Sequence, residues 1–322
     1  MHAPRITACR QTPRVATLTE DLAGLRAQVL GLAEAAGWQA EPRTLSVRPP
    51  WGRLAPEFWP WPLRAVDPQA LENLPDVLLG GGGKAAAVLA ALRHRHGRPA
   101  RVIVQHPRMD ITRFDLVVAN RHDELTGPNV IVTRTALHRA TPSRLAAEAA
   151  LWRERLAALP RPLVAVLVGG SNGRFRLGLP EGEALVQRLT GLLRGGAGVA
   201  LTPSRRTEPA VRALLAERLA PLGGWVWDFT GENPYFGLLA LADAIVVTAD
   251  SVSMVSEAVA TSAPVLLQRL PGRSRRIGLF LDGLLRDGRI REFTGALEQW
   301  PVQPMDDTAV AADTMRRRLG FA

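Results

Sequence analysis

The chain has 322 residues, of which 47% are hydrophobic, and its formal net charge at pH 7 is +10. This length suggests about two domains, and no apolar run approaches the ~20 residues that cross a bilayer. A single cysteine, Cys9, excludes an internal disulfide and a metal site built on several cysteines.

Arginine supplies almost all of the positive charge, because Lys84 is the only lysine. Guanidinium groups bind phosphates through paired hydrogen bonds, which favours phosphorylated substrates or an anionic membrane as partners. We find no zinc-finger, RRM or recognition-helix pattern, so we expect no nucleic-acid partner. The N-terminal residues lack a continuous apolar core, so we expect no signal peptide. We expect a cytoplasmic protein that could also lie peripherally on the inner membrane face.

The first half of the chain predicts a parallel α/β sheet, because short buried strands alternate with helical patterns. Strands are expected at residues 14–18, 45–47, 76–79, 101–105, 115–119 and 129–133, and helices at 25–36 and 143–159, with an alanine-rich helix that ends at His96. Residues 49–62, the tryptophan–proline segment, hold three of the eight tryptophans. Their prolines exclude a regular helix or a central strand. This segment could form an apolar flap or simply pack over the domain.

Polar groups follow the strands of this half, at the edge where open α/β sheets bind ligands. His106 and Arg108 follow one strand, and His122 and Asp123 follow the next. His122 or Asp123 could act as a general base, although adjacent residues need not face each other. The run Gly80–Lys84 resembles a phosphate loop, but it lacks the first glycine and the Ser or Thr of a Walker A motif.

The stiff sequence Pro160-Arg161-Pro162 marks the expected domain boundary. We expect a first domain over residues 1–159, a second over 160–303, and a C-terminal helix within 304–322 that returns to the first domain. Strands are expected at residues 163–168, 198–202, 224–228, 244–248 and 265–267, and helices at 181–193, 208–219, 237–242, 252–260 and 308–319.

Two loops of the second half suggest anion binding. Gly169-x-Ser171-x-Gly173 matches the nucleophile elbow of hydrolases, but no helix follows at once and every histidine lies upstream of Ser171, against the hydrolase order. The same glycines suit a loop that lets a diphosphate approach the backbone. Arg205 and Arg206 follow a neighbouring strand and could hold that diphosphate, although solvated arginines are the simpler interpretation.

Residues 233–264 predict a helix, a buried strand, a polar loop and a second helix. The candidate binding residues of this stretch are Asn233, Asp250, Ser251, Ser253 and Glu257. The first N–H groups of a helix lack internal partners and attract anions. Glu257 lies one to two turns into the helix, where a carboxylate could accept the hydroxyls of a ribose. The alternative is an ordinary turn in which Asp250 or Ser251 caps the helix.

The sequence predicts neither a metal site nor a cofactor. No Asp-x-Asp occurs, so the commonest metal-binding signature of sugar transfer is missing. Arginines and a helix N-terminus could instead stabilise a leaving diphosphate.

Several segments resemble known proteins. Two α/β halves with glycine and arginine loops in the second resemble GT-B glycosyltransferases. VLVGGSNG resembles the glycine loop of the lipid-linked N-acetylglucosaminyltransferase of peptidoglycan synthesis, and DSVSMVSEA resembles the helix whose Glu contacts the ribose in that superfamily. QHPRMDITRFDLVVANRHDELTGPNVIVT, SRRTEP and NPYFGLLALADAIVVTADSVSMVSEA resemble the "elongate mitochondria" family of plant mitochondrial-fission factors and bacterial proteins often labelled nucleoside-diphosphate-sugar epimerase-like. GGGGK departs from the SAGRR usual in these relatives.

The resemblance implies an α/β fold in which two Rossmann-like parallel-sheet domains face a cleft that binds a nucleotide sugar. The second domain would hold the donor, with Gly169, Gly170, Ser171 and Gly173 near the diphosphate, Arg205, Arg206, Ser251 and Ser253 as donors to it, and Glu257 on the ribose. The first domain would face the acceptor, with His122, Asp123 and His106 as candidate catalytic residues.

We therefore expect a metal-independent glycosyltransferase that acts on an envelope or lipid-linked acceptor. The alternative is a non-catalytic, membrane-associated recruitment protein that retains the fold. An epimerase is disfavoured, because a Rossmann epimerase needs a Tyr-x-x-x-Lys pair and Leu239 stands four residues after the only tyrosine, Tyr235.

Overall fold

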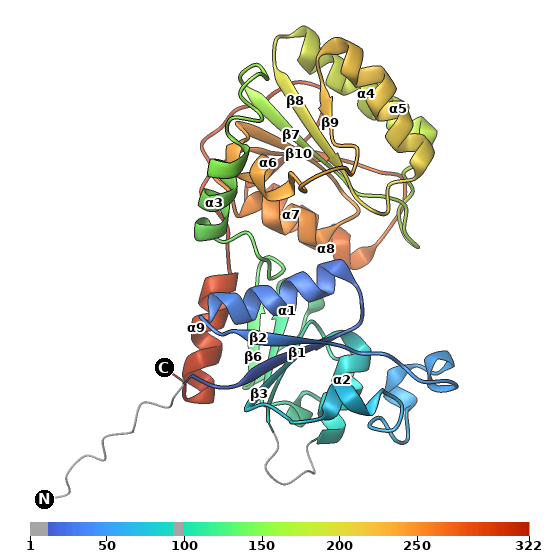
Figure 1. The fold of residues 1–322 in the computed structure, drawn as a ribbon, viewed down its shortest axis with the longest axis vertical. Helices are drawn as coiled ribbons and strands as arrows, with labels where there is room; N and C mark the ends of the chain where they lie inside the picture. Colours follow the sequence, from blue (N-terminus) through green and yellow to red (C-terminus); the bar gives the residue numbers. More distant parts are fainter. Residues whose placement is uncertain (1–11, 93–98, 322) are drawn as a thin grey trace, which may run out of the picture. The chain divides into compact units, whose positions relative to one another are not determined.

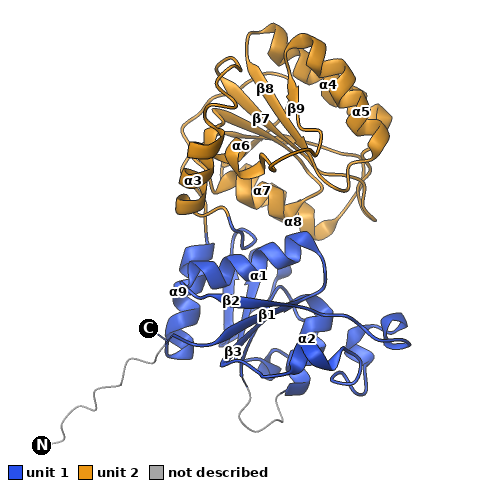
Figure 2. Cartoon of the chain, in the orientation of Figure 1, with its two compact units in different colours: residues 1–139, 307–322 blue, residues 140–306 orange. Residues whose placement is uncertain are grey.

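The computed structural model describes residues 12–92 and 99–321. Cys9 and the expected helix end at His96 lie outside the described residues. The chain forms two compact units, drawn in different colours in Figure 2: unit 1 is residues 1–139 with 307–322, and unit 2 is residues 140–306. The described strands form one six-stranded parallel sheet in each unit, which confirms the predicted α/β class with two Rossmann-like domains.

The sheet of unit 1 has the strand order β2-β1-β3-β4-β5-β6 (Figure 1). Its strands are β1 Val15–Thr19, β2 Ala40–Thr44, β3 Val77–Gly81, β4 Ala100–Val104, β5 Leu116–Asn120 and β6 Val130–Thr133. β1 pairs with both β2 and β3, with Val15 opposite Ala40 on one side and Val77 on the other. The strand order changes direction at β1, as in doubly wound sheets.

Helices cover both faces of this sheet. They are α1 Ala23–Ala35, α2 Gly82–Ala91 and α9 Thr308–Leu319. Side chains alternate along β3, so Val77 and Leu79 join a core with α1 and α9, whereas Leu78 joins a core with α2. The C-terminal helix α9 therefore completes the layer that α1 begins.

The sheet of unit 2 has the order β12-β11-β10-β7-β8-β9. Its strands are β7 Leu163–Val168, β8 Gly198–Pro203, β9 Trp225–Val226, β10 Ala244–Thr248, β11 Val265–Gln268 and β12 Ile290–Glu292. Every residue of β7 and β10 is buried, as expected for central strands of a parallel sheet covered on both faces.

The helices of unit 2 are α3 Pro142–Trp152, α4 Leu179–Arg194, α5 Pro209–Leu219, α6 Tyr235–Leu241, α7 Val252–Val259 and α8 Arg275–Arg286. Local sequence explains several of their ends. The backbone N–H of Gly178 donates to Glu181 at 2.8 Å at the start of α4, and the hydroxyl of Ser274 accepts from Ile277 at the start of α8.

Some elements differ from the prediction in position, and strand β12 was not predicted. The second strand is β2 and not residues 45–47, because an edge strand can be polar and this one carries Pro42. Residues 153–159 do not continue α3. Helix α8 was not predicted, although Ile277, Phe280, Leu281 and Leu284 give it a buried stripe at helical spacing.

Helix α3 lies in unit 2, where it packs against α6, whereas residues 143–159 were expected in the first domain. Trp152 shows how close the two helices are. A Cβ added to Gly237 of α6 would lie 2.3 Å from the ring of Trp152. The helix therefore belongs to the layer that supports β7 and β10.

Candidate functional site

The best-defined polar cluster of unit 2 surrounds Asp250, which follows β10. Its carboxylate accepts from the N–H of Gly170 at 3.1 Å, the hydroxyl of Thr248 at 2.7 Å and the guanidinium of Arg206 at 2.7 Å. The Asp250 side chain is completely buried, and that of Arg206 is 42% exposed. The cluster ties together the ends of β7, β8 and β10, which are neighbours in the sheet.

Close approach inside this cluster explains the first two glycines of the predicted loop. A Cβ on Gly169 would lie 2.2 Å from both carboxylate oxygens of Asp250, and one on Gly170 would lie 2.2 Å from the carbonyl oxygen of Arg206. The N–H of Gly169 donates to Thr248 at 2.8 Å. The N–H groups of both glycines therefore donate to protein acceptors, and the lack of a side chain at each glycine allows the close packing of the turn.

The remaining residues of the loop form a braced turn. The hydroxyl of Ser171 accepts from the N–H of Leu177 at 3.0 Å and donates to Glu208 at 3.1 Å. Asn172 accepts from the N–H groups of Arg174 and Phe175 at 2.9 and 3.0 Å. Helix α4 begins only at Leu179, so Ser171 does not occupy the strand-to-helix turn of a nucleophile elbow.

Several of the predicted binding residues are exposed to solvent. Gly173, Arg205 and Asn233 are exposed, and a Cβ on Gly173 would meet no atom within 4 Å. The side-chain oxygen of Asn233 accepts from the N–H of Tyr235 at 3.0 Å at the start of α6. Both arginines of the predicted pair, Arg205 and Arg206, are therefore exposed to solvent.

Helix α7 begins as the sequence predicts, with Ser251 as its N-cap, whose hydroxyl accepts from the N–H of Met254 at 3.3 Å. The first turn also carries the half-buried Ser253. The other end of α7 is held by Arg289, whose buried guanidinium donates to the carbonyls of Val259, Thr261 and Ala263. Burial lowers the pKa of Arg289 to about 10.

Glu257 lies inside unit 2 and is only 6% exposed. The hydroxyl of Tyr235 donates to its carboxylate at 2.5 Å. Burial raises the pKa of Glu257 to about 7, against the smaller effects of the Tyr235 hydrogen bond and the positive charge of Arg144. Burial, with the nearby carboxylate, also raises the pKa of Tyr235.

Sequence reasoning missed both partners of Glu257. Tyr235 lies 22 residues away in the chain, with no periodic signal that links the two. Arg144 lies in α3, where its guanidinium stacks 3.9 Å from the centre of the Phe236 ring. The assignment of α3 to the other domain concealed this contact.

The predicted catalytic residues of unit 1 follow β4 and β5, which are neighbouring strands. Nδ1 of His106 accepts from the N–H of Arg108 at 2.9 Å, and His122 is buried. Asp123 accepts from the N–H of Asn120 at 3.2 Å and so caps its own short turn. These residues share one sheet edge, which is the edge where open α/β sheets bind ligands.

This edge of unit 1 also carries backbone in the left-handed region. Gln105, Arg108 and Glu124 have φ values of 75°, 57° and 53°. Such conformations are costly for residues other than glycine and concentrate at functional sites. Nearby, Lys84 pairs with Glu20 at 2.5 Å, so its charge is engaged within unit 1.

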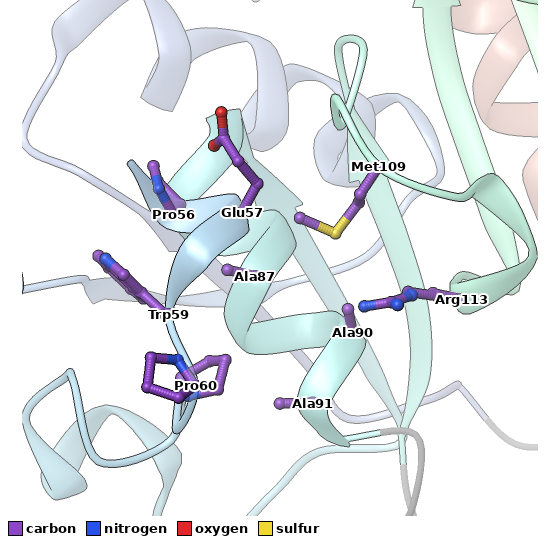
Figure 3. A pocket seen from close by; sticks show the side chains of 10 residues that line it. Pro56, Glu57, Trp59, Pro60, Ala87, Ala90, Ala91, Met109 and Arg113 are labelled. Atoms are coloured by element: carbon purple, nitrogen blue, oxygen red, sulfur yellow. The ribbon is translucent and has the colours of Figure 1, made fainter. Parts of the chain in front are cut away.

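A cavity of about 410 Å³ lies elsewhere in unit 1, between the tryptophan–proline segment and α2 (Figure 3). Ala87, Ala90 and Ala91 of α2 form one wall, with Trp59 on one side and Arg113 on the other. No residue of the predicted site lines this cavity. Within the described residues, no group of three His, Cys, Asp or Glu side chains could hold a metal ion, and no helix is long and apolar enough to cross a membrane.

Comparisons with known proteins match most of the chain. A family model described as mitochondrial fission ELM1 matches residues 23–319. The mitochondrial fission protein ELM1 of Arabidopsis thaliana is 32% identical over 273 residues, which cover 76% of this chain and 64% of that protein. The chain thus spans less than two-thirds of that relative. The uncharacterized protein RP120 of Rickettsia prowazekii is 22% identical over 289 residues, covering 76% of this chain and 80% of that protein.

Solved structures show which fold this is. A UDP-GlcNAc 2-epimerase from Neisseria meningitidis bound to UDP-GlcNAc matches with a TM-score of 0.56 and 12% identity, covering 96% of this chain and 100% of that chain. UGT71G1 from Medicago truncatula, complexed with UDP-glucose, matches with a TM-score of 0.52 and 12% identity, covering 95% and 90%. Identities this low show the fold alone. The chain therefore has the GT-B-like α/β fold and belongs to the mitochondrial fission ELM1 family.

Proposed function

We propose that this protein binds a nucleotide sugar through unit 2 and transfers the sugar, without a metal ion, to an envelope or lipid-linked acceptor. The supporting observation is the Asp250 cluster, which sets the capped start of α7 beside the arginine-bearing turn after β8. The N-terminus of a helix beside guanidinium groups suits a diphosphate. Two proteins of the same fold were solved with UDP-sugars, which gives the ligand class a precedent.

In this proposal the two parts of the glycine turn have different roles. Gly169 and Gly170 hold the turn against Asp250 and leave the diphosphate to other donors. Arg205 and the exposed edge of Arg206 face the phosphates, together with Ser253 in the first turn of α7. Arg206 is oriented for this role because Asp250 fixes one side of its guanidinium.

Glu257 would bind the ribose in its ionised form. A carboxylate accepts hydrogen bonds from both ribose hydroxyls, and Tyr235 would share the same oxygens. Because the pKa of Glu257 is raised to about 7, binding through the carboxylate becomes more favourable as the pH rises through 7. Donor affinity should rise roughly tenfold between pH 6 and pH 8 if one proton leaves Glu257 on binding.

The base would come from unit 1, with His122, Asp123 or His106 as the candidates. Removal of a proton from the acceptor hydroxyl creates the nucleophile, which attacks the anomeric carbon as the bond to the diphosphate breaks. The arginines and the α7 N-terminus then stabilise the charge on the leaving diphosphate.

Calorimetric titration of the full chain with UDP-, GDP- and ADP-sugars at pH 8 tests this proposal. We expect one nucleotide class to bind. Arg205→Gln should weaken that binding, whereas Arg153→Gln, an exposed arginine just after α3, should not. Glu257→Gln should also weaken it and remove its dependence on pH. A folded protein that binds no nucleotide sugar at millimolar concentration would exclude the donor site.

Measuring sugar transfer by variants tests which residue is the general base. His122→Ala should abolish sugar transfer and leave donor affinity unchanged, and full activity would remove His122 from the mechanism. The fold does not distinguish transfer from epimerisation, because the matching structures include a 2-epimerase. The missing Tyr-x-x-x-Lys pair concerns epimerases of another fold. The nucleotide sugar should therefore also be incubated with the protein without acceptor and followed by NMR. Inversion of a carbon within the sugar would show that the reaction is epimerisation and not transfer.

A non-catalytic binding or recruitment role is the second candidate. The burial of Glu257 and the internal hydrogen bonds of Gly169 and Gly170 favour it, because they leave fewer open donors and acceptors for a nucleotide. The name of the Arabidopsis relative, a mitochondrial fission protein, is in line with such a role. Absence of nucleotide binding together with an intact fold would support it.

A further inference from the structure

The tryptophan–proline segment of unit 1 exposes large apolar side chains to solvent. Leu54, Phe58 and Trp61 are 47%, 73% and 59% exposed. Among the described residues, Phe58 and Trp61 are the only aromatic side chains in the exposed class. Single exposed apolar residues are common on soluble proteins. Three within eight residues are unusual, and we refer to Leu54, Phe58 and Trp61 as the apolar patch.

The patch is presented by a fixed loop. Trp59 lies between the exposed residues, is 5% exposed, and donates its indole N–H to the carbonyls of Trp51 at 3.1 Å and Leu54 at 3.2 Å. The rings of Trp51 and Trp61 meet edge to face at 6.3 Å. Trp59 thus anchors the segment in the core beside α2, while the side chains on either side of it stay exposed.

The charge around the patch is positive. Between residues 48 and 64 the sequence has three arginines, Arg48, Arg53 and Arg64, and one acid, Glu57. All four side chains belong to exposed residues. Aromatic side chains favour the boundary between lipid headgroups and acyl chains, and arginines beside them can reach lipid phosphates.

The backbone of the segment argues against a protein strand as the partner. Its five prolines, Pro49, Pro50, Pro56, Pro60 and Pro62, have no N–H to offer to a pairing strand. Its regular parts are single 3₁₀ turns at Trp51–Arg53 and Pro56–Phe58. Such a loop binds through its projecting side chains, and a bilayer accepts these without a complementary shape.

We propose that the tryptophan–proline segment docks this protein on an anionic lipid bilayer. Leu54, Phe58 and Trp61 enter the interfacial layer, while Arg53 and Arg64 contact lipid phosphates. This docking uses unit 1 alone and does not depend on nucleotide-sugar binding by unit 2, so each can fail without the other.

Flotation of the full chain with lipid vesicles tests the proposal. The protein should float with vesicles of phosphatidylcholine and phosphatidylglycerol and much less with phosphatidylcholine alone. Phe58→Ala with Trp61→Ala should reduce the partition coefficient about tenfold or more, because two interfacial side chains are lost. The matched control, Leu179→Ala with Leu222→Ala, removes side chains that are 50% and 42% exposed in unit 2 and should bind like the wild type.

A second pair of variants tests the charge. Arg53→Gln with Arg64→Gln should weaken binding to the anionic vesicles and reduce its sensitivity to salt. Arg153→Gln with Arg194→Gln makes the same charge change on exposed residues of unit 2 and should have much less effect. Circular dichroism establishes that each variant is folded. The proposal is overturned if the wild type does not float with anionic vesicles, or if either control pair loses as much binding as its partner pair.

Discussion

The two glycine-rich turns of the molecule close around ion pairs that differ in burial. In unit 1, Nζ of Lys84 lies 2.5 Å from Glu20, and the two side chains remain 31% and 27% exposed. In unit 2, Arg206 lies 2.7 Å from Asp250, whose side chain has no exposed surface. Water reaches both side chains of the first pair and can solvate either charge if the other is removed. The buried carboxylate of the second pair is stabilised only by protein groups.

Glycine has a packing role in both turns. A Cβ on Gly81 would lie 2.8 Å from Val29 of α1, and one on Gly169 would strike Asp250. A side chain at either glycine would therefore clash with a neighbouring residue of the same unit. A glycine run after a buried strand thus indicates close approach of some group, and the group can be a helix or a carboxylate as readily as a phosphate.

The largest effect should come from Glu257, the other buried acid of unit 2. Its pKa is about 7 in the folded protein against a usual value of 4.5, so the folded state binds more protons than the unfolded state between these values. The free energy of unfolding should therefore fall by about 3 kcal/mol as the pH rises from 4.5 through 7. Glu257→Gln removes this titration and keeps an oxygen that can accept from Tyr235.

Urea unfolding at pH 4.5, 6 and 8 measures this effect. Relative to the wild type, Glu257→Gln should gain about 3 kcal/mol between the lowest and the highest pH. Glu183→Gln is the control, because Glu183 is exposed on α4 and pairs with Arg218 at the surface. Parallel pH profiles for the wild type and Glu257→Gln would show that Glu257 titrates normally.

The sequence predicts the central strands and several helix ends well, for a physical reason. β7 and β10 are apolar runs between polar or proline-containing turns, and both agree with the predicted ranges. The N-cap Ser251 is a local signal of the same kind. These features depend on neighbours in sequence, which a single chain reveals.

The hydrogen bonds of the candidate site join residues that are far apart in the sequence, and no local sequence pattern predicts them. Asp250 could be recognised as a loop residue, but not as the buried acceptor for Gly170 and Arg206. The pairing of Tyr235 with Glu257 joins two helices across the unit. Helix α8 is different, because its apolar spacing is visible in the sequence and could have been used.

Arg206→Gln should have the next largest effect. The substitution leaves the buried carboxylate of Asp250 with the hydrogen bonds of Gly170 and Thr248 but without a neutralising charge. Loss of one partner from a fully buried pair costs several kcal/mol. Because the Arg206 side chain is 42% exposed and two donors to Asp250 remain, the cost here should be about 2 kcal/mol. Hydrogen exchange of β7 and β10 should accelerate accordingly. Arg205→Gln, which alters the exposed neighbour, is the control and should leave exchange unchanged.

Lys84→Gln should have the smallest effect, although it removes the only lysine and a closer ion pair. Glu20 can turn to water once Lys84 is gone, so we expect a loss of only about 0.5 kcal/mol in urea unfolding. Arg26→Gln, which breaks the exposed pair with Asp21, should cost about as little. A cost for Lys84→Gln equal to that of Arg206→Gln would contradict the contrast between the two turns. It would show that burial of the acidic partner does not determine how much each ion pair contributes to stability.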